Sequence, residues 1–348
     1  MSTDIDFLAT VEAVEHQRRA RRNFIRLCGG VAAMSGGLSL LAACNDDNGN
    51  TPTPSPTPTP SPTTAAVTDP DILNFALQLE YLEANYYAYA VGGAGIPASL
   101  QTGTGAQGTV ITGTGAGAAR AVNFTDAIIA QYAREIAADE IAHVTFLRGQ
   151  LGSAASAQPS INLSGSLGLT TPAGTNVSGA FTQAAVAAGI DLTATGGVFD
   201  PYANDTNFLI GSYLLTDVGV TAYRGSARLI TNKTYLEAAA GILATEAYHD
   251  GVIRSELYRL GLSTASIFTN VQRISDARDS LDGATDLDQG IGTAATANLV
   301  PTDANSLALG RTASQVLNVV YLTANTGASA GGFFPSGVNG TIRTTNIT

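Results

Sequence analysis

The stretch Ala137-Ala-Asp-Glu140-Ile-Ala-His143-Val144 has a counterpart with the same Glu-x-x-His spacing, Leu243-Ala-Thr-Glu246-Ala-Tyr-His249-Asp250. In each copy a His follows a Glu by three residues, inside a long stretch of helical periodicity. This spacing places both side chains on one face of a helix, about one turn apart. A carboxylate and an imidazole that converge from one face form half of a metal site. The pattern therefore predicts two helices that bring Glu140, His143, Glu246 and His249 to a shared centre.

The histidine count makes a chance origin of this pattern improbable. The chain has three His, and His16 precedes the folded part, so both remaining His follow a Glu by three. Glu is rare after the first 44 residues. The chance that both histidines have a Glu three residues before them by accident is therefore on the order of one in two thousand. Apolar residues also correspond between the copies: Ile136 pairs with Ile242, and Leu147 with Ile253. We interpret the copies as an internal repeat of helix pairs.

Caps and periodicity predict an all-α chain with four long helices. The first begins at Asp69-Pro70-Asp71, an acidic cap followed by Pro. The predicted long helices cover 69–92, a range that starts at 123–126 and ends at 151, 205–230 and 232–260, and shorter ones cover 180–188, 264–281 and 312–322. Residues 153–204 form a long crossover, which a bundle of this kind needs to bring its third helix beside its partner. Residues 92–119 are a Gly-rich loop or a small hairpin around 109–112.

The remaining carboxylate ligands must come from the first and third helices. Glu80 is the predicted ligand of the first helix, because Leu73 and Leu77 mark its stripe as a core face. Glu83 lies one turn further on and is a second ligand or a proton acceptor. Tyr87 and Tyr86 follow Glu80 by seven and six residues, so either tyrosine can stack near the site.

The third helix matches this pattern less well. A strict repeat places the ligand at Thr216, whose side chain is a poor ligand, with Tyr223 seven residues later. The neighbouring Asp217 is the only carboxylate in the body of this helix. Either Asp217 supplies the fourth carboxylate with a shorter reach, or the second metal position is incomplete. We predict Asp217 as the ligand.

Composition limits the partners and the metals. The formal net charge is −11, which argues against nucleic acid, since nucleic acid requires Lys and Arg on one face. The two cysteines, Cys28 and Cys44, both lie in the first 44 residues. The folded part therefore has neither a disulfide nor a thiolate ligand, and O and N ligands suit Fe, Mn or Zn.

The N-terminal residues are predicted to direct export. Arg21-Arg22 and the residues after it match a twin-arginine pattern, and the apolar run that follows ends in a lipobox at Cys44. The alternatives are an ordinary signal peptide or a buried helix. Residues 1–44 are thus a twin-arginine lipoprotein signal with lipidation at Cys44, and the Pro/Thr-rich residues 45–68 are an extended tether. We expect export across the bacterial inner membrane to the periplasm or cell envelope, with a lipid anchor in a membrane.

Several strings together resemble a known superfamily. They are ILNFALQLEYLEA from residue 72, DEIAH from 139, DVGVTAYRGSA from 217, EAYH from 246 and GGFFPSGVNG from 331. With them the chain resembles the ferritin-like superfamily, and within it bacterial ferritin-like proteins similar to plant desiccation-related proteins. The resemblance implies a ferritin-like four-helix bundle over 69–285, a C-terminal extension over 286–348 that packs on the bundle, and a dinuclear Fe or Mn site. A Glu is common in this branch where the chain has Thr216.

Two functions follow as expectations. The first is an exported, lipid-anchored oxidoreductase that uses two Fe or Mn ions on oxygen, peroxide or Fe(II). The second is a non-enzymatic envelope protein of stress or desiccation with a degenerate or empty metal site. A homo-oligomer is compatible with the sequence. A closed ferritin cage is not expected, because a tether, a long crossover and a large C-terminal extension would obstruct its shell.

Overall fold

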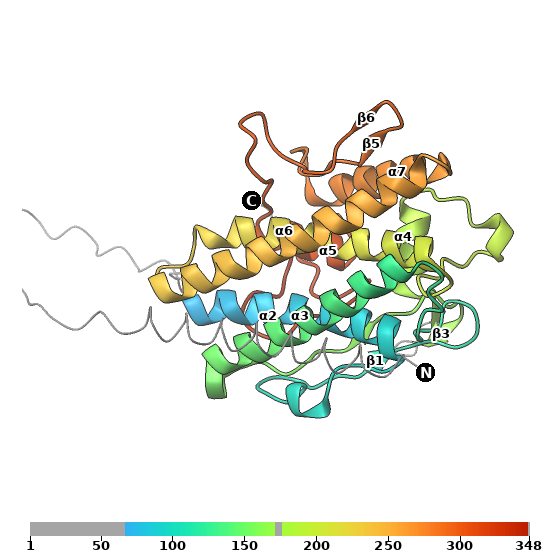
Figure 1. The fold of residues 1–348 in the computed structure, drawn as a ribbon. Helices are drawn as coiled ribbons and strands as arrows, with labels where there is room; N and C mark the ends of the chain where they lie inside the picture. Colours follow the sequence, from blue (N-terminus) through green and yellow to red (C-terminus); the bar gives the residue numbers. More distant parts are fainter. Residues whose placement is uncertain (1–66, 171–175, 347–348) are drawn as a thin grey trace, which may run out of the picture. The chain divides into compact units, whose positions relative to one another are not determined.

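A computed structural model describes residues 67–170 and 176–346 of the chain. Four long helices form its core, and they confirm the predicted ferritin-like all-α bundle (Figure 1). They are α2 (Asp69–Gly92), α3 (Ala127–Leu151), α5 (Asp205–Ala227) and α6 (Lys233–Gly261). Helix α2 packs most closely on α3, and α5 on α6, so the bundle consists of two helix pairs, as the internal repeat predicts.

Local sequence sets the ends of α2, although the capping residue is Thr68 and not the predicted Asp69. The Thr68 side chain accepts a hydrogen bond from the Asp71 backbone N–H, and the Asp71 carboxylate accepts one from the Thr68 backbone N–H, which completes a capping box. Pro70 occupies the first turn, where its missing N–H costs nothing. Gly93 ends the helix with φ 71°, in the left-handed region that favours glycine. The register of Glu80 within α2 is therefore fixed from both ends.

Helices α2 and α5 are buried on nearly all sides, whereas α3 and α6 each bury one face. The crossover covers the outer face of α2, where Asn74 and Tyr81 donate hydrogen bonds to backbone carbonyls of residues 154–156. Within the crossover lie α4 (Ala180–Ala187) and the strand pair β3 (Leu169–Thr170) and β4 (Asn176–Val177). Two of the four helices are thus shielded from water by segments outside the bundle.

The predicted hairpin around 109–112 is wrong. Strand β1 (Val110–Ile111) pairs in parallel with β2 (Ile161–Asn162) of the crossover, about fifty residues along the chain. The two segments meet because both run over the outside of α2. A local hairpin signal cannot reveal such a distant partner.

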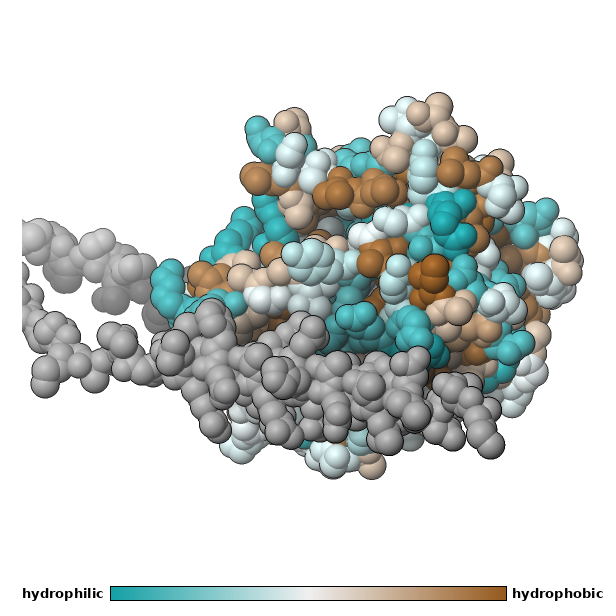
Figure 2. Space-filling view, in the orientation of Figure 1, coloured by the Kyte–Doolittle hydropathy of each residue, from teal (hydrophilic) through white to brown (hydrophobic). Residues whose placement is uncertain are grey.

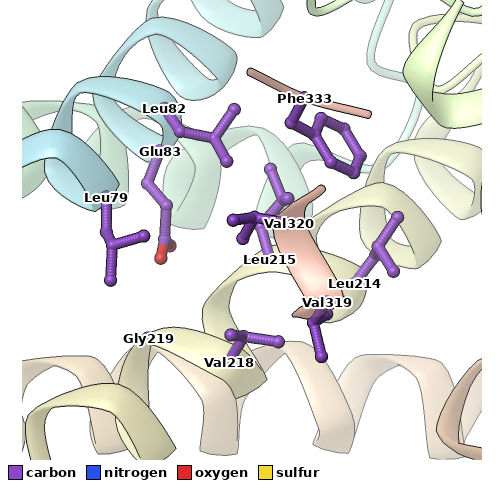
Figure 3. A pocket seen from close by; sticks show the side chains of 10 residues that line it. All are labelled: Leu79, Leu82, Glu83, Leu214, Leu215, Val218, Gly219, Val319, Val320 and Phe333. Carbon is purple, nitrogen blue, oxygen red and sulfur yellow. The ribbon is translucent and has the colours of Figure 1, made fainter. Parts of the chain in front are cut away.

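The C-terminal extension covers the outer side of α5. Helix α7 (Ser266–Asp282) precedes the extension, which includes β5 (Gly292–Thr293), β6 (Thr296–Ala297), α8 (Ala313–Val320) and a Gly-rich tail. Phe333 and Phe334 of the tail are buried, and Phe333 joins Val319 and Val320 of α8 over α2 and α5 (Figure 3). The two phenylalanines thus anchor the tail in the hydrophobic core.

Buried arginines hold this extension in place. Arg311 pairs with Asp282 and Asp288, and Arg278 pairs with Asp288 and with Asp217 of α5. All five side chains are nearly inaccessible to water. Because removing one member of a buried ion pair strands the other charge, the bundle and the extension depend on each other.

On the face shown in Figure 2, apolar residues are interspersed with polar ones. Large apolar side chains that remain exposed include Tyr248 and Val300. The helices in the described part of the chain all fall short of the length or the apolar character needed to cross a membrane. The predicted signal, the lipidation site Cys44 and nearly all of the tether lie outside the described residues.

Candidate metal centre

The two Glu-x-x-His copies face each other across the bundle. Helix α3 carries Glu140 and His143, α6 carries Glu246 and His249, and all four side chains are buried. Each pair projects inward from one face of its helix, as the three-residue spacing predicts. The imidazole centres of His143 and His249 lie 6.3 Å apart. The two repeats therefore bring their polar groups to one centre.

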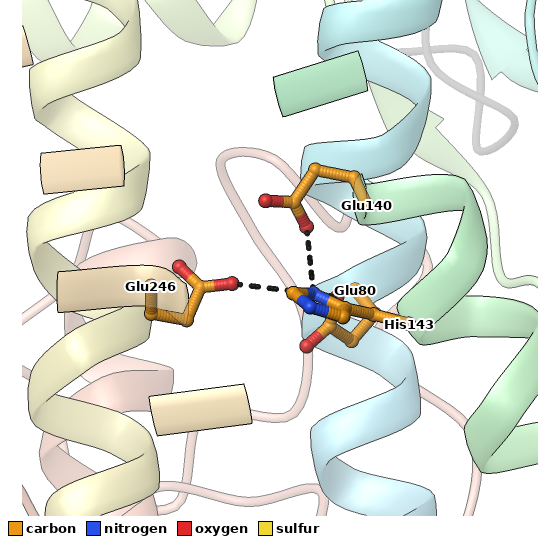
Figure 4. Close-up of side chains that lie close together, drawn as sticks. All are labelled: Glu80, Glu140, His143 and Glu246. Carbon is orange, nitrogen blue, oxygen red and sulfur yellow. Dashed lines mark ion pairs between the residues drawn. The ribbon is translucent and has the colours of Figure 1, made fainter. Parts of the chain in front are cut away.

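Glu80 of α2 completes a tight group of four. Ligand atoms of Glu80, Glu140, His143 and Glu246 all lie within 4.8 Å of one another (Figure 4). His143 Nδ1 is 3.3 Å from Glu80 Oε2, and 3.6 Å both from Glu140 Oε2 and from Glu246 Oε1. Three helices thus contribute to a single point inside the bundle.

Several atoms of this group lack a hydrogen-bond partner among the described residues. They are Glu80 Oε2, Glu140 Oε2, His143 Nδ1 and Glu246 Oε2. Buried polar atoms are nearly always paired, so an unpaired cluster needs an explanation such as an ion. Three carboxylate oxygens and an imidazole nitrogen are ligands that suit Fe, Mn or Zn. The residues present therefore fit a divalent cation.

His249 contacts two carboxylates of α3. Its Nδ1 lies 3.1 Å from Glu140 Oε1, and its Nε2 lies 3.3 Å from Asp139 Oδ2. Asp139 is partly exposed, and its role was not recognised in the sequence, although it directly precedes Glu140. Such a carboxylate behind an imidazole fixes the orientation of the ring. Glu140 contacts both histidines and is therefore the central carboxylate of the group.

Glu83, one turn after Glu80, brings a fourth carboxylate from α2. It is buried, and its Oε2 accepts a hydrogen bond of 2.9 Å from Thr216 Oγ1 of α5. A hydroxyl–hydroxyl bond of 2.7 Å joins Thr216 to Tyr87. A Cβ on Gly219 would lie only 2.7 Å from Glu83 Oε1 and 2.8 Å from Glu246 Oε2. Glycine at this position thus leaves room for two carboxylates to approach each other.

The structure does not place Asp217 in this group, which corrects the expectation that it supplies the fourth carboxylate. Its oxygens bind Arg278 and, at 3.3 Å, Arg254. Successive helical residues point about 100° apart, so Thr216 faces Glu83 while Asp217 faces α6 and α7. The two arginines lie 37 and 61 residues away in sequence, so local spacing could not reveal them.

Of the three tyrosines predicted near the site, Tyr223 and Tyr87 are linked to its carboxylates by hydrogen bonds, and Tyr86 is not. Tyr223 donates a hydrogen bond to Glu80 Oε1, and Tyr87 acts through Thr216. Tyr86 instead donates to the Phe208 carbonyl at 2.8 Å and lies in an aromatic cluster. The sequence left open whether Tyr86 or Tyr87 lies near the site, and the structure shows that Tyr87 is the tyrosine of α2 that faces the polar group.

Burial and mutual contacts shift the pKa of every carboxyl and imidazole in the group. Burial, reinforced by Glu140, raises the pKa of Glu83 and of Glu246 well above the usual range, and burial raises that of Glu80. Burial opposes charge on Glu140 too, but hydrogen bonds from both histidines outweigh it and lower its pKa to about 2.

The pKa values of the two histidines are raised, whereas burial alone lowers the pKa of an imidazole. Burial disfavours their charge, yet the facing carboxylates outweigh it and raise the pKa of His143 to about 11 and that of His249 to about 9. Without a metal, protonated histidines therefore supply the positive charge that the carboxylates need. A divalent cation can take their place by displacing these protons.

Comparison with known proteins agrees with this architecture. The ferritin-like domain family matches residues 68–259. The chain is 31% identical to the desiccation-related protein PCC13-62 of Craterostigma plantagineum over 265 residues, which covers 72% of this chain and 76% of that protein. It is 27% identical to the ferritin-like catalase Nec2 of Nesocodon mauritianus over 288 residues, covering 79% and 84%. No solved structure matches significantly. The chain therefore belongs to the ferritin-like domain family.

Proposed function

We propose that this protein is a metal-dependent oxidoreductase that binds two Fe or Mn ions and acts on oxygen, peroxide or Fe(II). The observation that carries the proposal is the convergence of ligand atoms from the buried Glu80, Glu140, His143 and Glu246, each of which has a side-chain atom without a hydrogen-bond partner among the described residues. Membership of the ferritin-like family and the catalase named among its relatives support it.

Six residues would hold the two ions. Glu80 and His143 lie on one side of the group, and Glu83 and His249 on the other. Glu140 contacts both histidines, and Glu246 has one oxygen near His143 and the other beside Gly219, where Glu83 also lies, so these two would lie between the two positions. Four carboxylates carry about −4, which two divalent cations balance. In this arrangement Glu83 supplies the carboxylate that α5 lacks.

A pair of redox-active ions at this place supplies two-electron chemistry. The residues around the site position the ligands. Thr216 holds Glu83, Tyr223 holds Glu80, and Asp139 orients the His249 ring. Burial excludes bulk water and strengthens each of these contacts. The partly exposed Asp139 marks the α3–α6 side as the polar approach for peroxide and protons.

We also propose export and membrane attachment. Arg21-Arg22 and the lipobox at Cys44 support a twin-arginine lipoprotein signal, and the Pro/Thr repeat after it supports a tether to a membrane. The twin-arginine route carries folded proteins, which suits a domain that receives its metal in the cytoplasm. Labelling with a radioactive fatty acid in the native host, with Cys44→Ser as the control, tests the anchor. Equal labelling of both proteins would refute it.

A second candidate function is a non-enzymatic protein of stress or desiccation with an empty or degenerate site. The name of the relative at 31% identity favours it. Metal analysis separates the two proposals. Protein purified without added metal should contain about two Fe or Mn per chain if the oxidoreductase proposal is right. Absence of metal in a stably folded protein, even after anaerobic loading with Fe(II) or Mn(II), would favour the second candidate.

Matched variants test the ligand assignment. The double variant His143→Ala with His249→Ala should lose bound metal while its helical circular dichroism stays near the parent value. Glu246→Gln should do the same, whereas Glu237→Gln, an exposed site on the same helix, should bind metal normally. Oxygen evolution from peroxide and oxygen consumption with Fe(II) then identify the reaction. Persistent metal binding in the histidine variant would show that the ligands lie elsewhere.

A further inference from the structure

A small apolar cavity adjoins the carboxylate group. It has a volume of about 20 Å³ and lies between α2, α5 and the C-terminal extension (Figure 3). Ten residues line it: Leu79, Leu82, Glu83, Leu214, Leu215, Val218, Gly219, Val319, Val320 and Phe333. Among these Glu83 has the only polar side chain. The cavity therefore ends at the carboxylate that we assign to the second metal position.

Size and polarity restrict what can occupy this cavity. A water-sized molecule needs roughly 10–15 Å³ by the same measure, so the space holds one small molecule. A buried water makes about three hydrogen bonds, and cavities without polar partners stay dry. Here Glu83 Oε2 already binds Thr216, which leaves Oε1 as the one side-chain acceptor in the wall. Water and hydrogen peroxide would lose hydrogen bonds on entry, whereas dioxygen would lose none.

A second cavity of about 20 Å³ continues along the α2–α5 interface. Leu79 lines both cavities, and the second one is bordered by Tyr223, whose hydroxyl binds Glu80. Apolar space thus reaches the polar group at two points, both on the α2–α5 side. The polar approach at Asp139 and His249 belongs to α3 and α6. The two sides of the centre consequently differ in polarity.

We propose that the cavity beside Glu83 is a dioxygen site. The inference rests on the proposed oxygen or peroxide chemistry, and it gives the C-terminal extension a function: Val319, Val320 and Phe333 close the cavity. Dioxygen has two sources in that chemistry. Two hydrogen peroxide molecules give two waters and one dioxygen, so the cavity receives a product. In Fe(II) oxidation dioxygen is the oxidant, so the cavity supplies a substrate.

Metal-free protein tests the binding site independently of activity. Dissolved dioxygen is paramagnetic and perturbs methyl resonances that it approaches. Under dioxygen pressure, methyls of Leu79 and Leu215 should shift and relax more than those of the buried Ile253 and Leu257, which line neither cavity. Nitrogen at equal pressure is the control. Equal effects at both sets of methyls would overturn the proposal.

Variants of α8 change the cavity without touching the carboxylates. Val320→Ile adds a methylene to the wall and should reduce the dioxygen effect at Leu215, which lines only this cavity, to that of the reference methyls. Val320→Ala should increase it. Val316→Ile, one turn earlier on α8 and outside the cavity, should leave it unchanged. If Val320→Ile fails to fold, Val320→Ala still decides, because an unchanged dioxygen effect there would refute the assignment.

Kinetics of metal-loaded protein distinguish the two sources. If dioxygen is a substrate, Val320→Ile should raise the KM for dioxygen in Fe(II) oxidation. If dioxygen is a product, the variant should lower kcat for peroxide disproportionation with the KM for peroxide unchanged. Normal kinetics in both assays would overturn the functional role. A protein without either activity would refute the proposed function, while the methyl measurements would still decide whether the cavity binds dioxygen.

Discussion

Replacing Gly219 with alanine puts a methyl group where two carboxylates meet. A Cβ on Gly219 would lie 2.7 Å from Glu83 Oε1 and 2.8 Å from Glu246 Oε2, whereas ordinary contacts begin at 3.4 Å. The two oxygens must therefore retreat by about 0.7 and 0.6 Å, which is roughly three times the 0.2 Å tolerance of a metal–ligand distance. We expect Gly219→Ala to bind one metal ion per chain instead of two, with Glu80 and His143 retained at the remaining position.

The assay is metal content after anaerobic loading and dialysis, combined with titration calorimetry. Gly241→Ala is the matched control, because Gly241 lies on α6 with open space around its Cβ position. That variant should bind two ions and gain about 0.5–1 kcal/mol of stability, since alanine is a better helix former. Circular dichroism of both metal-free variants establishes that each is folded. Two tightly bound ions in folded Gly219→Ala would refute the assignment of Glu83 to the second position.

Two further predictions concern charge. Because the pKa values of His143 and His249 are raised from 6.5 to about 11 and about 9, the folded state binds protons that the unfolded state releases as the pH rises above 6.5. Metal-free protein should therefore lose stability between pH 6.5 and 9, by up to about 1.4 kcal/mol per pH unit for each histidine. Urea unfolding measures this loss, and a stability that stays constant or rises with pH would contradict it. Asp217→Asn should cost about 3 kcal/mol or more, because it weakens a buried ion pair, yet leave the metal content at the parental value. Loss of one ion in that variant, measured in the folded protein, would restore Asp217 as a ligand.

The fold and half of the centre were predictable from sequence for local reasons. The acidic residues and Pro at 69–71 and the glycines at 92–93 indicated where α2 begins and ends, although the capping residue is Thr68, and the Glu-x-x-His spacing orients two residues of each repeat. These signals depend on contacts within one or two helical turns. Glu80 was identified in the same way, because its apolar neighbours on the helix define the inward face.

The rest of the centre depends on contacts between distant segments. Whether Thr216 or Asp217 faces inward is decided by Glu83 on one side and Arg278 on the other, and neither is close in sequence. Asp139 acquires its role only because α6 brings His249 beside it. The cavity wall likewise combines α2 with residues more than 230 positions later. Periodicity identifies a buried face, but it does not identify what lies opposite.

The buried arginines limit how far the chain can be shortened. The family match ends at residue 259, which includes Arg254 but leaves out Arg278 and Arg311. A fragment with that boundary would bury Asp217 beside a single arginine and would uncover α5 where the Arg311 backbone rests on Gly225 and Thr221. The charges of Asp217, Asp282 and Asp288 are therefore balanced only when Arg278 and Arg311 are both present. We therefore expect residues 68–259, the segment that matches the ferritin-like domain family, to be unstable without the residues that follow it.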